Sequence, residues 1–205
     1  MQFAGIYAIT DENLLAPDQL LAAVEIALNA GICMLQYRSK TGSDADRLEM
    51  ARALQKLCTA FAVPLIINDA VNLCEAVGAA GVHLGRQDSE LRQARRQLGP
   101  AAIIGVTCHA SLPLALAAEQ AGADYVAFGR FFPSHTKPQA PAAALSLLTQ
   151  ARRELTVPIV AIGGINAENG AAVRQAGADM LAIVHAIFGS SDVGASVHKL
   201  VQLYQ

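Results

Sequence analysis

The segment Pro64-Leu-Ile-Ile-Asn-Asp-Ala70 decides the fold class that the sequence predicts. Its apolar part is too short for a helix and is rich in isoleucine, which predicts a buried β-strand over Leu65–Ile67. Two polar side chains, Asn68 and Asp69, follow at once. In a barrel of parallel strands wrapped by helices, the residues that follow each strand form the rim at which ligands bind. The segment therefore predicts one strand of such a barrel together with part of its functional rim.

The rest of the chain repeats this alternation of strand and helix. Amphipathic stretches such as Asp18–Ala30 and Asp44–Phe61 are typical of helices that cover a sheet. The segments predicted to be strands are Ala4–Ile9, Ile32–Tyr37, Leu65–Ile67, Gly81–Leu84, Ala102–Val106, Tyr125–Phe128, Ile159–Ile162 and Met180–Val184. Strands that alternate with helices pair in parallel, and eight such units within 205 residues predict an α/β fold, a closed (β/α)8 or TIM barrel, with residues 1–205 forming a single domain.

A weak internal repeat supports this count. Glycine follows alanine at Gly31, Gly81, Gly122 and Gly177, in each case where a helix is expected to end and a strand to begin. Glycine adopts the left-handed conformation that ends a helix at little steric cost. The alternative is a doubly wound open sheet, which usually carries a glycine-rich turn after its first strand. The segment Thr10-Asp11-Glu12-Asn13 stands there instead, which favours the barrel.

The composition indicates which partners to expect. Charged residues make up 16% of the chain, against about 25% in an average protein, which is compatible with a subunit contact such as a homodimer. The net charge is −2 and no block of like charge occurs, so we expect small-molecule partners rather than nucleic acid or a membrane. The first residues lack a basic leader and the apolar run Val157–Ile165 is far too short to span a bilayer, so a soluble, cytoplasmic protein is expected.

The four cysteines are Cys33, Cys58, Cys74 and Cys108, and no two of them have the CxxC spacing. This pattern argues against a disulfide framework and against a zinc site. It predicts reduced, mostly buried thiols.

Candidate binding residues follow the second, third and fourth predicted strands. Gln36, Arg38 and Lys40 alternate, so in an extended chain they project to one face, where two neighbouring cations call for an anion. Asp69 and Asp88 are carboxylates suited to Mg²⁺, which prefers oxygen ligands. Asp88 is equally suited to be a helix N-cap, and the alternative for the cations is a solvated strand end. We expect His83, inside its strand, to be a hydrogen-bonded core histidine.

The later strands end in hydroxyl groups, a long loop and glycines. Thr107 offers a hydroxyl after the fifth strand, and the long segment 129–141 carries Lys137 and two hydroxyls, as an active-site lid commonly does, although an irregular surface loop is the alternative. Gly163 and Gly164 follow the seventh strand, where bare backbone N–H groups in this fold commonly bind phosphate. The rim thus predicts a cationic site for a diphosphate and a neutral site for a phosphate monoester.

These motifs together resemble those of the thiamine-phosphate synthase family, along almost the whole chain. The matching motifs are Gln36-x-Arg38-x-Lys40, Leu65-Ile-Ile-Asn68-Asp69, Gly81-Val-His-Leu-Gly-x-x-Asp88, Ile104-Gly-Val-Thr107, Ser134-x-Thr136-Lys137 and Ala161-Ile-Gly-Gly-Ile165. The resemblance implies a TIM barrel that condenses 4-amino-5-hydroxymethyl-2-methylpyrimidine diphosphate with a thiazole phosphate, releasing pyrophosphate and giving thiamine phosphate, with Mg²⁺ as cofactor.

The resemblance also implies roles for individual residues. The positions that match the family's contacts to the diphosphate substrate are Gln36, Arg38, Lys40 and Asn68. The positions that match its Mg²⁺ ligands are Asp69 and Asp88. The lid lysine on the diphosphate is matched by Lys137, and the hydroxyls near the thiazole phosphate by Ser134 and Thr136. The backbone phosphate site is matched by Gly164, Val184 and His185. Thr107 is also expected to bind substrate, and the expected catalytic groups are Arg38, Lys40 and Lys137.

Three positions depart from the family pattern. Thr107 stands where serine is usual and Ser134 where threonine is commonest, and both substitutions keep a hydroxyl. His185 replaces a serine at the phosphate site, which alters a side-chain contact but not a backbone one.

Two other activities compete with the synthase. The related thiazole tautomerase places a histidine just after the sixth strand, where this chain has Arg130, and Lys40, Asp88 and Lys137 also favour the synthase. A non-catalytic phosphate-binding barrel would need only the neutral site and could lose the cations and acids of the other.

Overall fold

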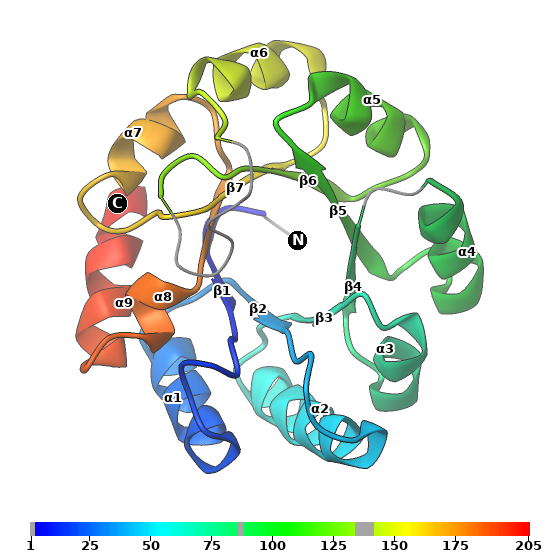
Figure 1. Cartoon of the computed structure of the whole chain (residues 1–205), viewed down its shortest axis with the longest axis vertical. Coiled ribbons are helices and arrows are strands. Elements are labelled where there is room, and N and C mark those ends of the chain that lie inside the picture. Colours follow the sequence, from blue (N-terminus) through cyan, green and yellow to red (C-terminus); the bar gives the residue numbers. More distant parts are fainter. Residues whose placement is uncertain (1–2, 86–87, 134–141) are drawn as a thin grey trace.

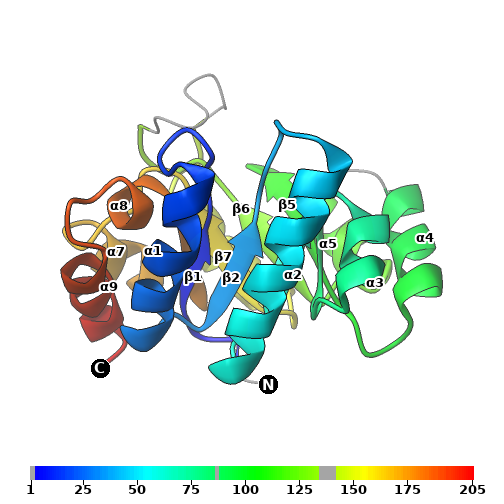
Figure 2. The same ribbon diagram turned by 90° about the horizontal axis from the view of Figure 1, so that it is seen from below.

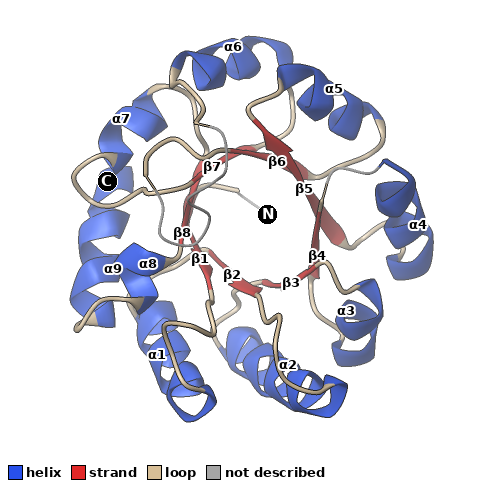
Figure 3. Cartoon of the chain, viewed as in Figure 1, coloured by secondary structure: helices blue, strands red, loops and turns tan. Residues whose placement is uncertain are grey.

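Eight parallel strands pair in chain order, and β8 pairs with β1 again, so that the sheet closes into a barrel. This arrangement is seen in the computed structural model, which describes residues 3–85, 88–133 and 142–205. Figures 1 and 3 show the strands as an inner ring and the helices as an outer ring. The predicted (β/α)8 barrel is confirmed.

The elements follow one another as predicted. The strands are β1 (Gly5–Ile9), β2 (Met34–Tyr37), β3 (Leu65–Asn68), β4 (Gly81–Leu84), β5 (Ile103–His109), β6 (Tyr125–Phe128), β7 (Ile159–Ile162) and β8 (Met180–Ile183). The helices are α1 (Pro17–Asn29), α2 (Asp44–Ala60), α3 (Val71–Val77), α4 (Asp88–Leu98), α5 (Leu112–Gln120), α6 (Ser146–Glu154), α7 (Gly170–Gln175), α8 (His185–Phe188) and α9 (Val193–Val201), followed by a 3₁₀ turn (Gln202–Tyr204). None of the helices that the structure describes is long and apolar enough to span a membrane.

The core has two parts, because alternate residues of each strand face opposite sides of the barrel wall. The larger part lies between the strands and the helices. The smaller part fills the inside of the barrel with side chains that include Tyr7, Met34, Ile66, Tyr125 and Met180. The lower half of the barrel is therefore packed, and a cavity can open only toward the other end. Figure 2 shows the C-terminus and the start of β1 at the lower end, opposite the β1–α1 and β2–α2 loops.

Strand β5 is longer than predicted. The sequence predicts an end at Val106, whereas the strand continues to His109 with an irregularity between Thr107 and His109. Two polar residues, Thr107 and His109, ended the predicted strand. They are compatible with strand structure here because both line the cavity at the top of the barrel instead of facing the packed core.

The glycine repeat holds at three of its four positions. Gly31, Gly122 and Gly177 have positive φ angles of 101°, 95° and 123° and follow helix ends as predicted. The prediction of a helix end is wrong for Gly81, which is the first residue of β4, while α3 ends at Val77 and is capped by Gly78 with φ 63°. Gly81 serves close packing instead, because a Cβ atom there would overlap the Ile103 carbonyl.

Two aspartates, Asp124 and Asp179, stand two residues after Gly122 and Gly177 and join neighbouring strands at the lower end of the barrel. The Asp124 carboxylate accepts a hydrogen bond from the Ile104 amide of β5 (2.7 Å) and pairs with Arg95 of α4 (2.6 Å). Asp179 makes the same two bonds, to the first amide of β7 (2.8 Å) and to Arg152 of α6 (2.8 Å). Each aspartate thus ties two strands and one helix together, and we call these two groups the Arg–Asp staples.

The four cysteines are free, and three of them are buried, with Cys33 half-buried. Burial raises the pKa of Cys58 and of Cys33 to about 12, so both stay protonated thiols at neutral pH. The prediction of free, mostly buried thiols is confirmed.

Candidate active site

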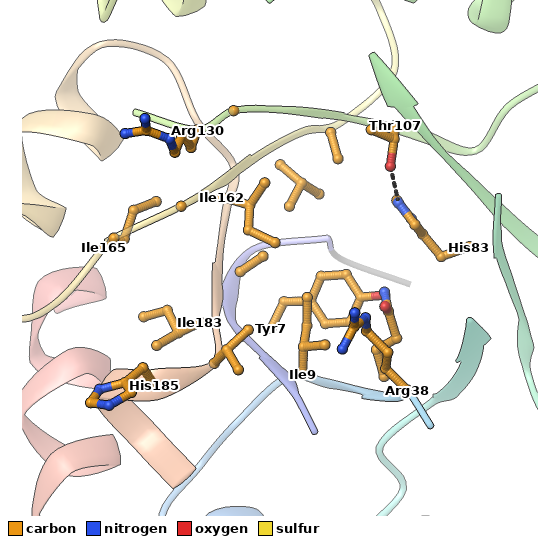
Figure 4. A pocket seen from close by; sticks show the side chains of 18 of the residues that line it. Tyr7, Ile9, Arg38, His83, Thr107, Arg130, Ile162, Ile165, Ile183 and His185 are labelled. Atoms are coloured by element: carbon orange, nitrogen blue, oxygen red, sulfur yellow. Dashed lines mark hydrogen bonds between the residues drawn. The ribbon is translucent and has the colours of Figure 1, made fainter. Parts of the chain in front are cut away.

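A cavity opens at the end of the barrel where the strands finish, and we call it the central cavity (Figure 4). Its walls come from all eight strand ends. The polar or glycine residues that line it are Tyr7, Gln36, Arg38, Asn68, His83, Thr107, His109, Gly129, Arg130, Gly163, Gly164 and His185. Figure 4 shows Arg38, His83 and Thr107 on one side and Arg130, Ile165 and His185 on the other. The cavity thus has two polar walls separated by the apolar side chains of Ile9 and Ile162.

The cavity brings together seven of the sequence-predicted site residues. These are Gln36, Arg38, Asn68, Thr107, Gly164, Val184 and His185. They come from five different strand ends, so their meeting is a consequence of barrel closure.

Lys40 does not join Gln36 and Arg38, contrary to the predicted alternation. Its side chain is exposed and does not line the central cavity. Strand β2 ends at Tyr37, and the chain turns at Gly42 with φ 82°, so the two-residue period is no longer maintained at Lys40. Arg38 is the cation of this motif that reaches the cavity.

One carboxylate holds the loop after β2 in place. Glu12 Oε2 accepts hydrogen bonds from the backbone amides of Lys40 (2.9 Å) and Thr41 (3.1 Å) and from the hydroxyls of Ser39 (2.9 Å) and Thr41 (2.9 Å). Partial burial raises the pKa of Glu12, but these hydrogen bonds outweigh it and the net pKa is lowered. The loop next to Arg38 is therefore anchored to the β1–α1 loop by a charged group.

Asp69, one of the two expected Mg²⁺ ligands, lies beside the central cavity and does not line it. Asn68 faces the cavity, whereas Asp69 lines a separate groove with Leu84, Gly85 and Glu90. Asp69 has a left-handed backbone (φ 61°), and its Oδ2 accepts a hydrogen bond from Asn68 Nδ2 (2.8 Å). Asp69 thus does not line the central cavity together with Arg38, and its carboxylate is connected to that cavity through the Asn68 side chain.

The groove nevertheless suits a hard cation. It offers the carboxylates of Asp69 and Glu90, and oxygen atoms are the ligands that Mg²⁺ prefers. Asp88 begins helix α4 at the edge of the same region, and its side chain lies outside the described part. Among the described residues, no three His, Cys, Asp or Glu side chains gather closely enough to hold a metal by themselves. The donors present therefore fit a Mg²⁺ ion that takes few protein ligands and completes its shell with phosphate and water.

The loop predicted to act as a lid falls on residues that the structure does not describe. Ser134, Thr136 and Lys137 lie outside the described residues.

The loop after β7 contains two glycines with positive φ angles. Gly163 and Gly164 have φ angles of 104° and 65°, and a Cβ atom on Gly164 would overlap the Pro133 carbonyl. Asn169 fixes the loop, because its side-chain amide donates to the Gly164 carbonyl (2.9 Å) and its Oδ1 accepts from the Asn166 amide (2.9 Å). Bare backbone on this wall of the cavity can approach an anion closely.

The sequence prediction missed three polar residues of the cavity. His109 has a left-handed backbone (φ 51°) and is half-buried in the wall, and Arg130 lies against Gly163. Both directly continue strand ends, so the rule that found the other rim residues applies to them as well. Tyr7 lies inside a strand, and no sequence signal distinguishes it from a core residue.

A chain of hydrogen bonds runs through the floor of the cavity. Gln36 Nε2 donates to the Tyr7 hydroxyl (2.7 Å), which bonds the Tyr125 hydroxyl (2.9 Å). The Tyr125 hydroxyl bonds His83 Nδ1 (2.9 Å), and His83 Nε2 bonds Thr107 Oγ1 (2.8 Å). His83 is thus a hydrogen-bonded histidine as predicted, although it also lines the cavity. Burial raises the pKa of both tyrosines, so they remain hydrogen-bond donors. We call these five residues the floor network.

Comparisons with known proteins agree on one family. The family model described as thiamine monophosphate synthase matches residues 6–187. A thiamine-phosphate synthase from Thiobacillus denitrificans is 50% identical over 202 residues, covering 98% of this chain and 94% of the relative. Another from Marinobacter nauticus is 52% identical over 193 residues, covering 93% and 86%. The solved thiamine phosphate pyrophosphorylase from Pyrococcus furiosus matches with a TM-score of 0.89 and 32% identity over 98% of this chain and 96% of that chain. The chain belongs to the thiamine-phosphate synthase family.

Proposed function

We propose that this chain is a transferase of thiamine biosynthesis that condenses 4-amino-5-hydroxymethyl-2-methylpyrimidine diphosphate with a thiazole phosphate. The products are thiamine phosphate and pyrophosphate. The observation that carries the proposal is the central cavity, in which Arg38 and Thr107 face the glycine loop across the apolar side chains of Ile9 and Ile162. Such a cavity suits two phosphorylated rings held side by side, one on each wall.

The reaction breaks a carbon–oxygen bond to diphosphate and forms a carbon–nitrogen bond to the thiazole. Electrons of the breaking bond leave with the pyrophosphate, so negative charge grows there, and Arg38 is placed to stabilise it. The electron-rich aminopyrimidine tolerates the positive charge left on its methylene carbon, and the thiazole nitrogen then donates its lone pair to that carbon. We therefore propose a largely dissociative displacement in which the chain acts by charge and by positioning, without a protein nucleophile.

The second wall holds the acceptor substrate. The amides of the Gly163–Gly164 loop and of the Val184–His185 segment are proposed to bind the thiazole phosphate. Backbone amides suffice for this contact, so the replacement of the usual serine by His185 is compatible with it. Lys40, Ser134, Thr136 and Lys137 are proposed to add contacts to the phosphates when the substrates are bound.

Asp69 and Asp88 are the residues that would hold Mg²⁺, which when bound would supply positive charge to the diphosphate. Asn68 links the two regions, because it lines the cavity and donates to Asp69. This hydrogen bond orients the Asp69 carboxylate.

The test is product formation from the two purified substrates, with and without EDTA. Thiamine phosphate and pyrophosphate are expected in equal amounts, and EDTA is expected to abolish both. Arg38→Ala is expected to lower kcat/KM by about 10- to 150-fold, since a hydrogen bond to a charged group contributes about 1.5–3 kcal/mol. Arg47→Ala is the matched control, because Arg47 pairs with Asp44 outside the cavity.

Other outcomes identify the competing activities. Aromatisation of a thiazole tautomer without pyrophosphate release would favour the tautomerase. Tight binding of phosphate esters with no turnover in the presence of Mg²⁺ would favour a binding protein. Full activity of Arg38→Ala at saturating substrate would contradict the assigned role of that residue.

A further inference from the structure

The floor network connects two residues that line the central cavity from different strands. Gln36 belongs to β2 and Thr107 to β5, and both line the central cavity. Between them the bonds pass through Tyr7, Tyr125 and His83. Tyr125 is completely buried and is not among the residues that line the cavity. It is therefore a residue that can act on a substrate only through its neighbours.

We propose that Tyr125 is a positioning residue that fixes the hydrogen-bonding direction of both Gln36 and Thr107. The inference rests on the proposed function, since it assigns to these two side chains a fixed way of meeting the substrate.

With the Gln36 amide nitrogen facing Tyr7, the position of each hydrogen in the network follows. Gln36 Nε2 can only donate, so the Tyr7 oxygen accepts and its hydrogen goes to the Tyr125 oxygen. Tyr125 has one hydrogen and gives it to His83 Nδ1, so a neutral His83 carries its proton on Nε2 and donates to Thr107 Oγ1. The Thr107 hydrogen then remains for a ligand. Gln36 keeps its carbonyl oxygen as the acceptor that it can offer to the cavity.

If the donor and acceptor of one hydrogen bond in the network exchange roles, those of the others must exchange as well. If His83 carried its proton on Nδ1, Tyr125 would accept from it and would donate to Tyr7. The Tyr7 hydrogen would then need an acceptor, which is available only if the Gln36 amide turns its oxygen inward. The histidine tautomer and the amide orientation are therefore coupled, and the Tyr125 hydroxyl is the link. A buried hydroxyl without an acceptor costs about 1–3 kcal/mol, so mixed states are disfavoured.

The surrounding sequence makes room for this link. Gly105 lies in the middle of β5, and a Cβ atom there would overlap the ring and hydroxyl of Tyr125. The Tyr125 ring leans over Gly105 to stack on His83 (5.6 Å between centroids) and meets the Tyr7 ring edge-on (5.9 Å). Glycine weakens a strand interior, and its presence here follows from the close approach of the tyrosine.

The consequence is a cavity wall with a donor at Thr107 and an acceptor at Gln36. A ring that carries an amino donor and a ring-nitrogen acceptor, as an aminopyrimidine does, can satisfy both groups. We infer that the floor network favours a ring with this arrangement of donor and acceptor, and that it does not affect binding of the thiazole phosphate.

Tyr125→Phe removes the link and keeps the ring. The variant is expected to raise KM for the pyrimidine diphosphate about 3- to 10-fold, the value of one lost hydrogen bond, and to leave KM for the thiazole phosphate within twofold. Tyr204→Phe is the matched control, because its ring lies under Arg174 and its hydroxyl is outside the network. Gly105→Ala, which displaces the Tyr125 ring, is expected to raise KM for the pyrimidine diphosphate by more than Tyr125→Phe does, again with little change in KM for the thiazole phosphate.

A spectroscopic measurement tests the inference without any substrate. Nitrogen-15 NMR of the histidine rings, with His83 assigned by comparison with His83→Gln, is expected to show a single tautomer protonated on Nε2 in the unaltered chain. Tyr125→Phe is expected to give a mixture of the two tautomers, and Tyr204→Phe no change.

Two results would overturn the inference. One is a Tyr125→Phe variant that keeps the single tautomer and both KM values. The other is an equal rise of both KM values with a lowered Tm and an unchanged tautomer, which would show a merely structural role. If the unaltered chain formed no thiamine phosphate, the proposed function would fail, and the NMR result would still decide the role of Tyr125.

Discussion

At the scale of single residues, Glu12 stabilises the loop next to Arg38 although its own side chain is only partly buried. Its carboxylate collects four hydrogen bonds from the loop that follows β2, next to Arg38. Glu12→Gln replaces the charged acceptor by a weaker one. We expect the variant to have a lower Tm at pH 7 and a higher KM for the pyrimidine diphosphate. Glu25→Gln on α1 is the control and should leave both values unchanged.

The contribution of Glu12 to the stability of the fold should depend on pH. Because folding lowers the pKa of Glu12 below its usual value of about 4.3, the charged group stabilises the fold above that pH, and this contribution is lost as the pH falls through the lowered pKa. The difference in Tm between the unaltered chain and Glu12→Gln should therefore shrink below about pH 4. A difference that stayed constant from pH 7 to pH 3 would contradict the role given to the charge.

Gly164 allows a second prediction at the same scale. Gly164→Ala places a methyl group against the Pro133 carbonyl and strains a backbone with φ 65°. We expect KM for the thiazole phosphate to rise at least about tenfold, while KM for the pyrimidine diphosphate changes little. Gly78→Ala is a close match, since Gly78 has φ 63° and nothing within 4 Å of the added atom. Its strain should lower Tm without an effect on either KM.

Some residues of the site could be predicted from the sequence, and others could not. Gln36, Arg38 and Thr107 were found because polar residues at strand ends meet at the rim of any closed barrel. Lys40 was misplaced because the two-residue period holds only as long as the chain stays extended. The bonds of His83 to Tyr125 and Thr107 join three strands, and no local pattern reports which side chains will meet across the interior.

At the scale of elements, the Arg–Asp staples are expected to stabilise the lower end of the barrel. Asp179→Ala removes the ion pair with Arg152 and leaves the first amide of β7 without its acceptor. An unpaired amide of this kind costs about 1–3 kcal/mol, so Tm should fall by several degrees. Asp44→Ala is the control, because the Asp44–Arg47 pair is fully at the surface on the Asp44 side and exposed pairs contribute about 0–1 kcal/mol. An equal fall in Tm for Asp179→Ala and Asp44→Ala would contradict the stabilising role given to the Arg–Asp staple.

Most strand positions were predicted because a short apolar run bounded by glycine or proline is distinctive. The end of β5 was not, because the prediction treated polar side chains as the end of a strand. His109 and Thr107 remain in the strand since their side chains face a cavity, and a cavity becomes visible only once the barrel has closed. Gly81 was misread for a related reason, as its packing partner Ile103 belongs to the next strand.

At the scale of the whole molecule, the two ends of the barrel have different structures. The packed interior, with Met34 and Met180, includes Tyr7 and Tyr125 of the floor network, and the central cavity opens at the strand ends. The staples of Asp124 and Asp179 hold the lower end, while Arg38 and the glycine loop belong to the upper end. This division is typical of TIM barrels, in which residues at the lower face serve stability and the upper loops serve chemistry.

The staples have a consequence for how this enzyme can change. Because Asp124 and Asp179 precede β6 and β8 and the central cavity lies at the other end of the strands, substitutions around the staples can change the stability of the protein without changing the lining of the cavity. An engineer who wants a heat-resistant variant should search around Asp124 and Asp179, and one who wants a new substrate should leave that end untouched.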